Sequence, residues 1–244
     1  MECNMKITAI IPARYSSSRL PGKPLKYICG KTMVQRVYEQ VKKVSLIDEV
    51  IVATDDQRIF DEVKKNNGNV TITSKEHKTG TDRLAEVAAK IDSDIIVNVQ
   101  GDEPLINPSV IKLAIEPLLA DTTLKMSTLK HLTNNKKEIN NPNIVKVITD
   151  KDDNAVYFSR SKIPYDRSSK QFEYFKHIGL YVYRKDFLLK YANMKSTPLE
   201  QQESLEQLRV IENGYTIKVI ETEYDSIGVD TEKDLNKVRK ILGE

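Results

Sequence analysis

Three cationic side chains follow one another closely near the start of the chain, at Arg14, Arg19 and Lys23. The residues between them include several small ones: Ser16, Ser17, Ser18 and Gly22. A triphosphate requires cations, backbone N–H donors and small residues that allow close approach. Neither the P-loop pattern GxxxxGK[ST] nor the dinucleotide pattern GxGxxG occurs here. The segment therefore predicts a phosphate-binding loop of another type, and a solvated basic surface loop is the alternative.

Two carboxylates with suitable neighbours lie far from this loop in the sequence. Asp102 belongs to the segment QGDEP, and Asp230 follows Gly228 and Val229. Carboxylate oxygens at a strand end can hold a magnesium ion that bridges phosphates. Asp102 and Asp230 are thus candidate metal ligands. The alternatives are a helix N-cap or turn residue for Asp102 and a turn before the last helix for Asp230.

A second set of candidates lies in the later half of the chain. Arg160 follows an apolar run and could clamp a substrate carboxylate, or it could be an ordinary surface arginine at a strand end. His177 and an acidic segment with Glu203, Glu206 and Gln207 offer groups that bind sugar hydroxyls. A structural histidine and a solvated helix face are the alternatives.

The first half of the chain alternates between apolar β-branched runs and helical patterns. Strands are expected at 6–13, 48–56, 69–74 and 93–105, and helices at 32–44, 57–68 and 81–91, with Thr79 or Thr81 as N-cap of the last. This alternation indicates an α/β fold with a parallel sheet. Ligands of such sheets bind at the carboxyl ends of the strands. Polar clusters occur at three expected strand ends, at 14–23, 54–56 and 100–103, which favours one shared site.

The second half has a different rhythm. A hairpin of strands is expected at 141–150 and 154–160, further strands at 176–184 and 215–222, and helices at 197–214 and 231–243, the last with Thr231 as N-cap. Neither an internal repeat nor a linker-like stretch is present. We therefore expect residues 1–244 to form a single domain with a smaller β-rich insertion.

Composition excludes some classes of protein. The 38 Lys and Arg residues against 35 Asp and Glu give a net charge of +3, which does not suggest a nucleic-acid partner. The apolar run 7–12 is too short for a membrane span, which needs about 20 residues. Cys3 and Cys29 lack zinc-site spacing and are expected as thiols in a reducing compartment, so we expect a cytoplasmic protein.

The motifs together resemble the 3-deoxy-manno-octulosonate (Kdo) cytidylyltransferase family, also called CMP-Kdo synthetases. The resemblance covers nearly the whole chain and is carried by IIPARYSSSRLPGKPL, TGTDRLAE, VNVQGDEPLI, NPNIVKV, YFSRSKIPYDR, HIGLYVYR, PLEQQESLEQLRVIENG and GVDTEKDL. It implies a Rossmann-like, mostly parallel central sheet of the nucleotide-diphospho-sugar transferase type, with a β-rich insertion for dimerisation and substrate binding. It also implies a homodimer that uses CTP and magnesium to form a CMP-sugar and pyrophosphate, for lipopolysaccharide or capsule synthesis.

The resemblance further implies roles for individual residues. It assigns catalysis to Lys23, Asp102 and Asp230, with the two aspartates as metal ligands. It assigns CTP to Arg14, Arg19, Lys23, Thr79, Gly80, Thr81 and Arg83. It assigns the sugar acid to Gln100, Arg160, His177, Tyr181, Glu206 and Gln207, with Arg160 near the carboxylate.

One departure concerns the sugar end. The family often has a histidine in the segment after PLE, where this chain has Gln201, Gln202 and Ser204. A related acidic sugar, such as 8-amino-Kdo or a nonulosonate, is therefore an alternative substrate. A sugar-1-phosphate nucleotidyltransferase is a further alternative, although its usual glycine-rich loop is absent. A nucleotide-binding regulator is another, although sensing alone does not require both Asp102 and Asp230.

Overall fold

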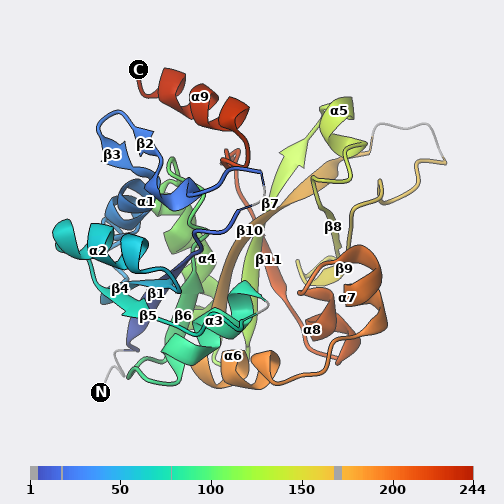
Figure 1. Cartoon of the computed structure of the whole chain (residues 1–244). Helices are drawn as coiled ribbons and strands as arrows, with labels where there is room; N and C mark the ends of the chain where they lie inside the picture. The colour runs from blue at the N-terminus through green and yellow to red at the C-terminus, as the bar shows by residue number, and fades with distance from the viewer. Residues whose placement is uncertain (1–4, 18, 78, 168–171, 244) are drawn as a thin grey trace. The chain divides into compact units, whose positions relative to one another are not determined.

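The computed structural model describes residues 5–17, 19–77, 79–167 and 172–243 (Figure 1). They form two compact units, the first from Met1–Lys112 and Ser226–Glu244 and the second from Leu113–Asp225. Cys3 and Ser18 lie outside the described residues. Whether the two units fold as the single expected domain stays a prediction.

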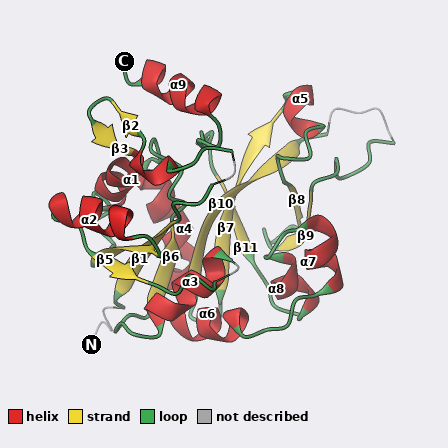
Figure 2. Ribbon diagram, in the orientation of Figure 1, coloured by secondary structure: helices red, strands yellow, loops and turns green. Residues whose placement is uncertain are grey.

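The first unit contains a parallel sheet, as expected from the sequence (Figure 2). Its strands are β1 (Ile7–Ala13), β4 (Glu49–Thr54), β5 (Val70–Ile72) and β6 (Ile95–Asn98), in the order β6-β1-β4-β5. All three pairings in this order are parallel. Ile10, Val52 and Val97 are inaccessible to solvent, as in parallel strands that are covered on both faces. The expected α/β fold class is confirmed.

The helices of this unit follow the expected pattern. They are α1 (Met33–Val41), α2 (Gln57–Lys65), α3 (Gly80–Ala88) and α9 (Glu232–Ile241), beside the short 3-10 helix η1 (Lys23–Leu25) and the hairpin β2 (Tyr27–Ile28) and β3 (Lys31–Thr32). Thr79 and Thr231 cap α3 and α9 in capping boxes with Asp82 and Asp234, respectively. The helix α4 (Pro108–Ala120), part of which belongs to each unit, was not expected from the sequence.

The C-terminal segment packs on the N-terminal part of the same unit. Helix α9 contacts β2, and Figure 1 shows the red helix beside the blue hairpin. The buried side chains that join these segments form one apolar cluster: Leu20, Ile28, Met33, Val229, Leu235 and Val238. Burial of this cluster holds the segment around Asp230 against the start of the chain.

The second unit is mainly antiparallel, in agreement with the expected β-rich insertion. Its strands are β7 (Met126–Thr133), β8 (Lys146–Thr149), β9 (Ala155–Ser159), β10 (Tyr174–Arg184) and β11 (Lys218–Glu221), in the order β11-β7-β10-β8-β9. The expected hairpin is β8 with β9. Strand β7 was not expected from the sequence, yet it lies between β10 and β11 and pairs with β11 in parallel. This unit also contains the helices α5 (Lys136–Ile139) and α6 (Lys185–Ala192).

The single helix expected at 197–214 is wrong. The structure has two helices there, α7 (Pro198–Glu203) and α8 (Leu208–Glu212). Ser204 between them has a left-handed backbone with φ 51°, which ends α7. Arg160 then donates to the carbonyl oxygens of Glu203 and Ser204, at 2.7 and 3.2 Å. The side chain of Arg160, distant in the sequence, therefore donates to carbonyl groups at the end of α7 that have no hydrogen bond within the helix.

Among the described residues, no helix combines the length and the apolar composition needed to cross a membrane.

Candidate active site

The loop after β1 is closed by its own backbone. The Gly22 N–H donates to the Tyr15 carbonyl at 3.0 Å, and Gly22 has a φ of 68°. A side chain at this position would meet the Tyr15 ring at 3.1 Å, so both the turn and the packing favour glycine. The closed loop presents its cations at the carboxyl end of β1.

Thirteen of the described residues of the first unit line a pocket of about 410 Å³. They are Pro12, Ala13, Arg14, Ser16, Ser17, Arg19, Lys23, Pro24, Gly80, Gln100, Gly101, Asp102 and Asp230. Small-molecule sites typically have volumes of roughly 300–1,000 Å³. The structure therefore brings together the ends of β1 and β6, the start of α3 and the segment before α9. Residues 54–56, the third polar cluster of the sequence analysis, are not among those that line this pocket.

The ammonium group of Lys23 lies between the two candidate metal ligands. Its Nζ atom is 2.7 Å from Oδ2 of Asp102 and 3.1 Å from Oδ1 of Asp230. Arg19 is paired with Asp230 at 3.0 Å. Burial lowers the pKa of Lys23, but the charges and hydrogen bonds of the two carboxylates outweigh this effect and raise it. Lys23 therefore stays protonated, in a cluster where positive and negative side chains alternate.

Backbone packing places Asp230 beside Asp102 although 128 positions separate them. The N–H of Val229 donates to the carbonyl of Asp102 at 2.9 Å, and the Val229 side chain is fully buried in the apolar cluster. Gly101 is equally constrained, since a Cβ there would lie 2.7 Å from the Pro12 carbonyl oxygen. This close approach brings the strand end that carries Asp102 next to β1.

Glu103 is a buried carboxyl that sequence analysis did not single out. It is 6% exposed, and its Oε2 atom has no hydrogen-bond partner among the described residues. Burial and then the charge of Asp102 raise its pKa to about 7, against a hydrogen bond with Ser226 that lowers it.

The pair Asp102 and Asp230 fits a hard divalent cation. Both carboxylates already share one cation, the Lys23 ammonium. Within the described part of the chain, no group of three His, Cys, Asp or Glu side chains could hold a metal by itself. Magnesium commonly takes one or two protein carboxylates and completes its shell with water and substrate phosphates. The donor set matches that pattern.

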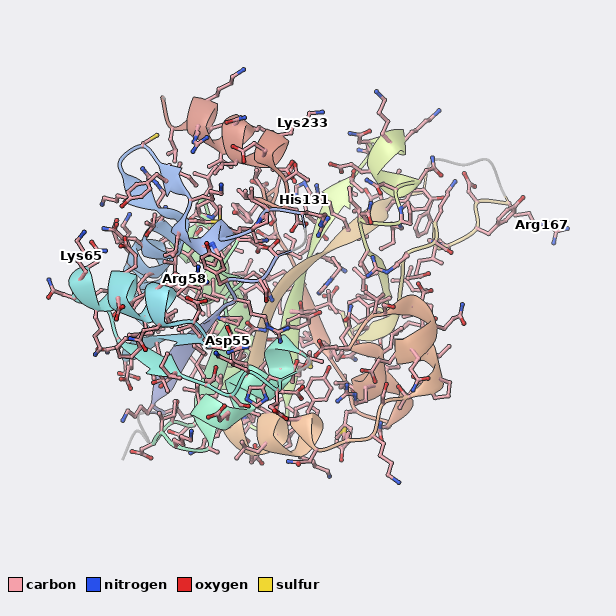
Figure 3. The ribbon with its side chains drawn as sticks, in the orientation of Figure 1. Asp55, Arg58, Lys65, His131, Arg167 and Lys233 are labelled. Atoms are coloured by element: carbon pink, nitrogen blue, oxygen red, sulfur yellow. The ribbon has the colours of Figure 1, made fainter. Side chains whose placement is uncertain are left out.

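The four residues assigned to CTP around α3 divide into two groups. Gly80 lines the pocket, and Thr79 uses its hydroxyl to accept from the Asp82 N–H at 3.1 Å. Thr81 is 6% exposed, and Arg83 is fully buried in an ion pair with Asp55 at 2.6 Å. In Figure 3 Asp55 marks the carboxyl end of β4. The structure therefore brings Gly80 to the pocket and encloses the Arg83 side chain in the protein.

The residues assigned to the sugar are split between the units. Gln100 lines the pocket in the first unit, and the others belong to the second. There, the rings of His177 and Tyr181 have centroids 5.3 Å apart. Burial and then the charge of Glu206 raise the pKa of Tyr181. These three residues therefore gather within the second unit.

The other two residues of this set, Arg160 and Gln207, have different surroundings. Gln207 is 5% exposed at the start of α8. Arg160 donates to backbone carbonyls, including that of Pro142 at 3.0 Å. It therefore holds together segments on either side of the hairpin β8–β9.

Comparison with known proteins now decides the family. A family model described as Cytidylyltransferase matches residues 8–220. The 3-deoxy-manno-octulosonate cytidylyltransferase of Geobacter metallireducens is 56% identical over 249 residues, which cover 98% of each chain. The chain belongs to the 3-deoxy-manno-octulosonate cytidylyltransferase family. Relatives of the same name in Geotalea daltonii and Fusobacterium nucleatum are 58% and 55% identical, each with 98% of both chains covered.

Solved structures agree with this membership of the cytidylyltransferases. A CMP:2-keto-3-deoxy-manno-octonic acid synthetase complexed with CTP matches with a TM-score of 0.94 and 44% identity, over 97% of this chain and 98% of that one. A cytidylyltransferase from Leptospira borgpetersenii matches with a TM-score of 0.64 and 19% identity, over 96% of this chain and 85% of that one. The second likeness shows the fold alone. The expected family and fold are confirmed, and the roles of single residues stay predictions.

Proposed function

We propose that this chain transfers CMP from CTP to the anomeric hydroxyl of Kdo, which yields CMP-Kdo and pyrophosphate. The observation that carries the proposal is the Lys23 ammonium held between Asp102 and Asp230, in a pocket that Arg14 and Arg19 also line. The names of relatives at 52–58% identity support the same reaction. The product serves lipopolysaccharide or capsule synthesis in the cytoplasm, and the enzyme is a homodimer.

The transfer proceeds by in-line displacement at the α-phosphorus. The sugar hydroxyl oxygen forms a bond to that phosphorus and loses its proton, and the bond to the bridging oxygen breaks as pyrophosphate leaves. Such a reaction depends on positioning and on neutralisation of charge more than on covalent catalysis. Arg14, Arg19 and Lys23 hold the triphosphate, and Lys23 stabilises charge on the α-phosphate.

Asp102 and Asp230 hold magnesium in this proposal. When bound, the metal supplies positive charge at the phosphates and lowers the pKa of the attacking hydroxyl. The two carboxylates converge on the Lys23 ammonium, with Arg19 paired to Asp230, and this convergence supports the assignment. A triphosphate that draws the two cations to itself leaves both carboxylates available to the metal.

We propose a role in binding the sugar acid for Gln100 of the first unit and, in the second unit taken by itself, for Arg160, His177, Tyr181, Glu206 and Gln207. The gathering of His177, Tyr181 and Glu206 supports a polar and aromatic surface for a polyhydroxy acid. Arg160 has backbone carbonyls as partners, so its contact with the sugar carboxylate requires a donor that these bonds leave available.

A panel of sugars and nucleotides tests the proposal. Pyrophosphate release is measured with CTP, UTP and ATP, each offered with Kdo, 8-amino-Kdo, N-acetylneuraminate and a sugar 1-phosphate. We expect release with CTP and Kdo. A clear preference for another acidic sugar would replace Kdo as the substrate, and release from a sugar 1-phosphate would contradict the reaction itself.

Asp102→Asn and Asp92→Asn form a matched pair of variants for the metal-binding role. Asp92 is fully exposed and is not among the residues that line the pocket, so its replacement should leave the rate unchanged. Loss of one metal ligand should lower kcat by about 100-fold or more. Parental activity in Asp102→Asn would contradict the assignment of Asp102.

A further inference from the structure

Arg83 lies in a buried polar network at the ends of two strands. Its side chain has no solvent exposure, and its guanidinium is 2.6 Å from Oδ2 of Asp55. It also donates to the hydroxyl of Thr73. Thr73 in turn donates through its hydroxyl and its N–H to the carbonyl of Thr54, at 3.1 and 2.8 Å.

This network joins three elements of the first unit. Thr54 ends β4 and Asp55 follows it, Thr73 follows β5, and Arg83 lies in the first turns of α3. A guanidinium buried without a partner is costly, so the pair with Asp55 strongly favours one placement of α3 against the two strand ends. The network thus sets where the N-terminus of α3 lies.

The start of α3 is also part of the pocket. Gly80, three positions before Arg83, lines the pocket together with Arg14, Arg19 and Lys23. The N-terminus of a helix offers backbone N–H groups and a partial positive charge to an anion. Whatever positions this turn therefore positions one wall of the nucleotide pocket.

We propose that Arg83 is a positioning residue for the nucleotide and does not contact it. Through Asp55 and Thr73 it places the first turn of α3, and this turn contacts the nucleotide. The inference rests on the proposed function only in taking CTP as the ligand of this pocket. It replaces the direct CTP contact that the family resemblance implies for Arg83.

The test compares CTP binding in variants at both ends of the ion pair. Arg83→Met and Asp55→Asn should each raise the Kd and KM for CTP by about 10- to 100-fold, with kcat changed much less. The double variant should be no worse than Arg83→Met, because that single variant already breaks the ion pair with Asp55. Arg83→Lys keeps the charge and should recover part of the affinity.

Lys90→Met is the matched control. Lys90 pairs with Glu86 at 2.7 Å, but its side chain is 59% exposed. Its replacement should leave CTP affinity unchanged. Thr73→Val probes the network without removing a charge, and it should also raise the Kd for CTP. It serves as the test if Arg83→Met does not fold.

Two results would overturn the inference. One is unchanged CTP affinity in both Arg83→Met and Thr73→Val. The other is weak binding in Arg83→Met together with parental binding in Asp55→Asn, which would show that Arg83 contacts the nucleotide itself. Binding is measured by calorimetry without sugar, so failure here is separate from a failure of the parent enzyme to release pyrophosphate in the substrate panel.

Discussion

Lys23 has two partners of opposite charge, and this arrangement has a consequence for metal binding. With Arg19 it balances the charges of Asp102 and Asp230. A neutral cluster attracts a divalent cation weakly. The Lys23 ammonium, 2.7 Å from a carboxylate oxygen of Asp102, also lies where a metal ion bound to that oxygen would have to lie. In the absence of nucleotide, Lys23 should therefore compete with the metal.

Replacing Lys23 tests this competition. Lys23→Met leaves the two carboxylates with one cation, so the nucleotide-free variant should bind Mn²⁺ about tenfold more tightly than the parent in electron paramagnetic resonance titrations. Its kcat/KM with CTP should fall by about 100-fold or more, because the phosphate contact proposed for Lys23 would be lost. Lys31→Met removes a lysine paired with Glu39 at 2.6 Å and is the control of equal charge. Equal Mn²⁺ affinity in all three proteins would contradict the competition.

His177 links stability to pH. Burial lowers its pKa to about 3, so the folded protein keeps it neutral while the unfolded chain protonates it near pH 6.5. Protons therefore favour unfolding, and the stability present above pH 6.5 is lost as pH falls toward 3. At pH 5 the loss should be about 1 to 2 kcal/mol.

The variant His177→Gln checks this sign. Between pH 7 and pH 5 it should lose less unfolding free energy than the parent, as measured by urea denaturation at each pH. Parallel pH profiles for the two proteins would refute the assignment.

Residue types predicted which charged groups would lie together, but not their individual contacts. Lys23, Asp102 and Asp230 were predicted to bind phosphate and metal; the structure gathers them in one cluster, and their roles stay predictions. The burial of Arg83 with Asp55 was not predicted. The local sequence around an arginine is the same whether its side chain faces a ligand or a carboxylate of the protein.

At the scale of elements, Gly101 controls how closely β6 and β1 approach. A Cβ there would lie 2.7 Å from the backbone oxygen of Pro12, so Gly101→Ala must displace one of the two strand ends. The expected loss of unfolding free energy is about 1 to 3 kcal/mol, accompanied by loss of activity as Asp102 moves. Thermal and urea denaturation measure the first effect and pyrophosphate release the second.

Gly228→Ala is the control for this substitution. A Cβ at Gly228 meets no atom within 4 Å, so stability should change by less than about 0.5 kcal/mol. A stability loss equal to that of Gly101→Ala would mean that the close contact with Pro12 is not the cause.

The elements that the sequence predicted correctly are those with strong local signals. Buried β-branched runs marked β1, β4 and β6, and the threonine caps marked the starts of α3 and α9. The break between α7 and α8 has no such signal, since Ser204 takes the left-handed conformation without being glycine. Contacts with Arg160, more than forty positions away, accompany that break.

At the scale of the whole molecule, the expected single domain can be tested by its cooperativity. Gly101→Ala destabilises the first unit, and Lys146→Met should destabilise the second. The Lys146 ammonium donates to the carbonyls of Asn141, Ile144 and Arg160, which would lose this donor at a cost of about 1 to 3 kcal/mol.

One domain predicts that either variant lowers the midpoint of a single urea transition, with far-UV circular dichroism and tyrosine fluorescence in agreement. Saturating CTP should raise the same midpoint, because it binds the folded state alone. Two transitions, each sensitive to the variant in its own unit, would show two domains.

The sequence by itself determined the parallel sheet, the cationic loop after β1 and the identities of the charged groups, because these depend on local patterns of burial and on residue chemistry. Only the tertiary structure decided which groups meet. Asp230 reaches Asp102 because burial of Val229 and one backbone hydrogen bond bring the C-terminal segment to the start of the chain. The Arg83 side chain is buried because Asp55 and Thr73, at the ends of β4 and β5, accept its hydrogen bonds. Such contacts join positions that are distant in the chain, and local patterns do not record them.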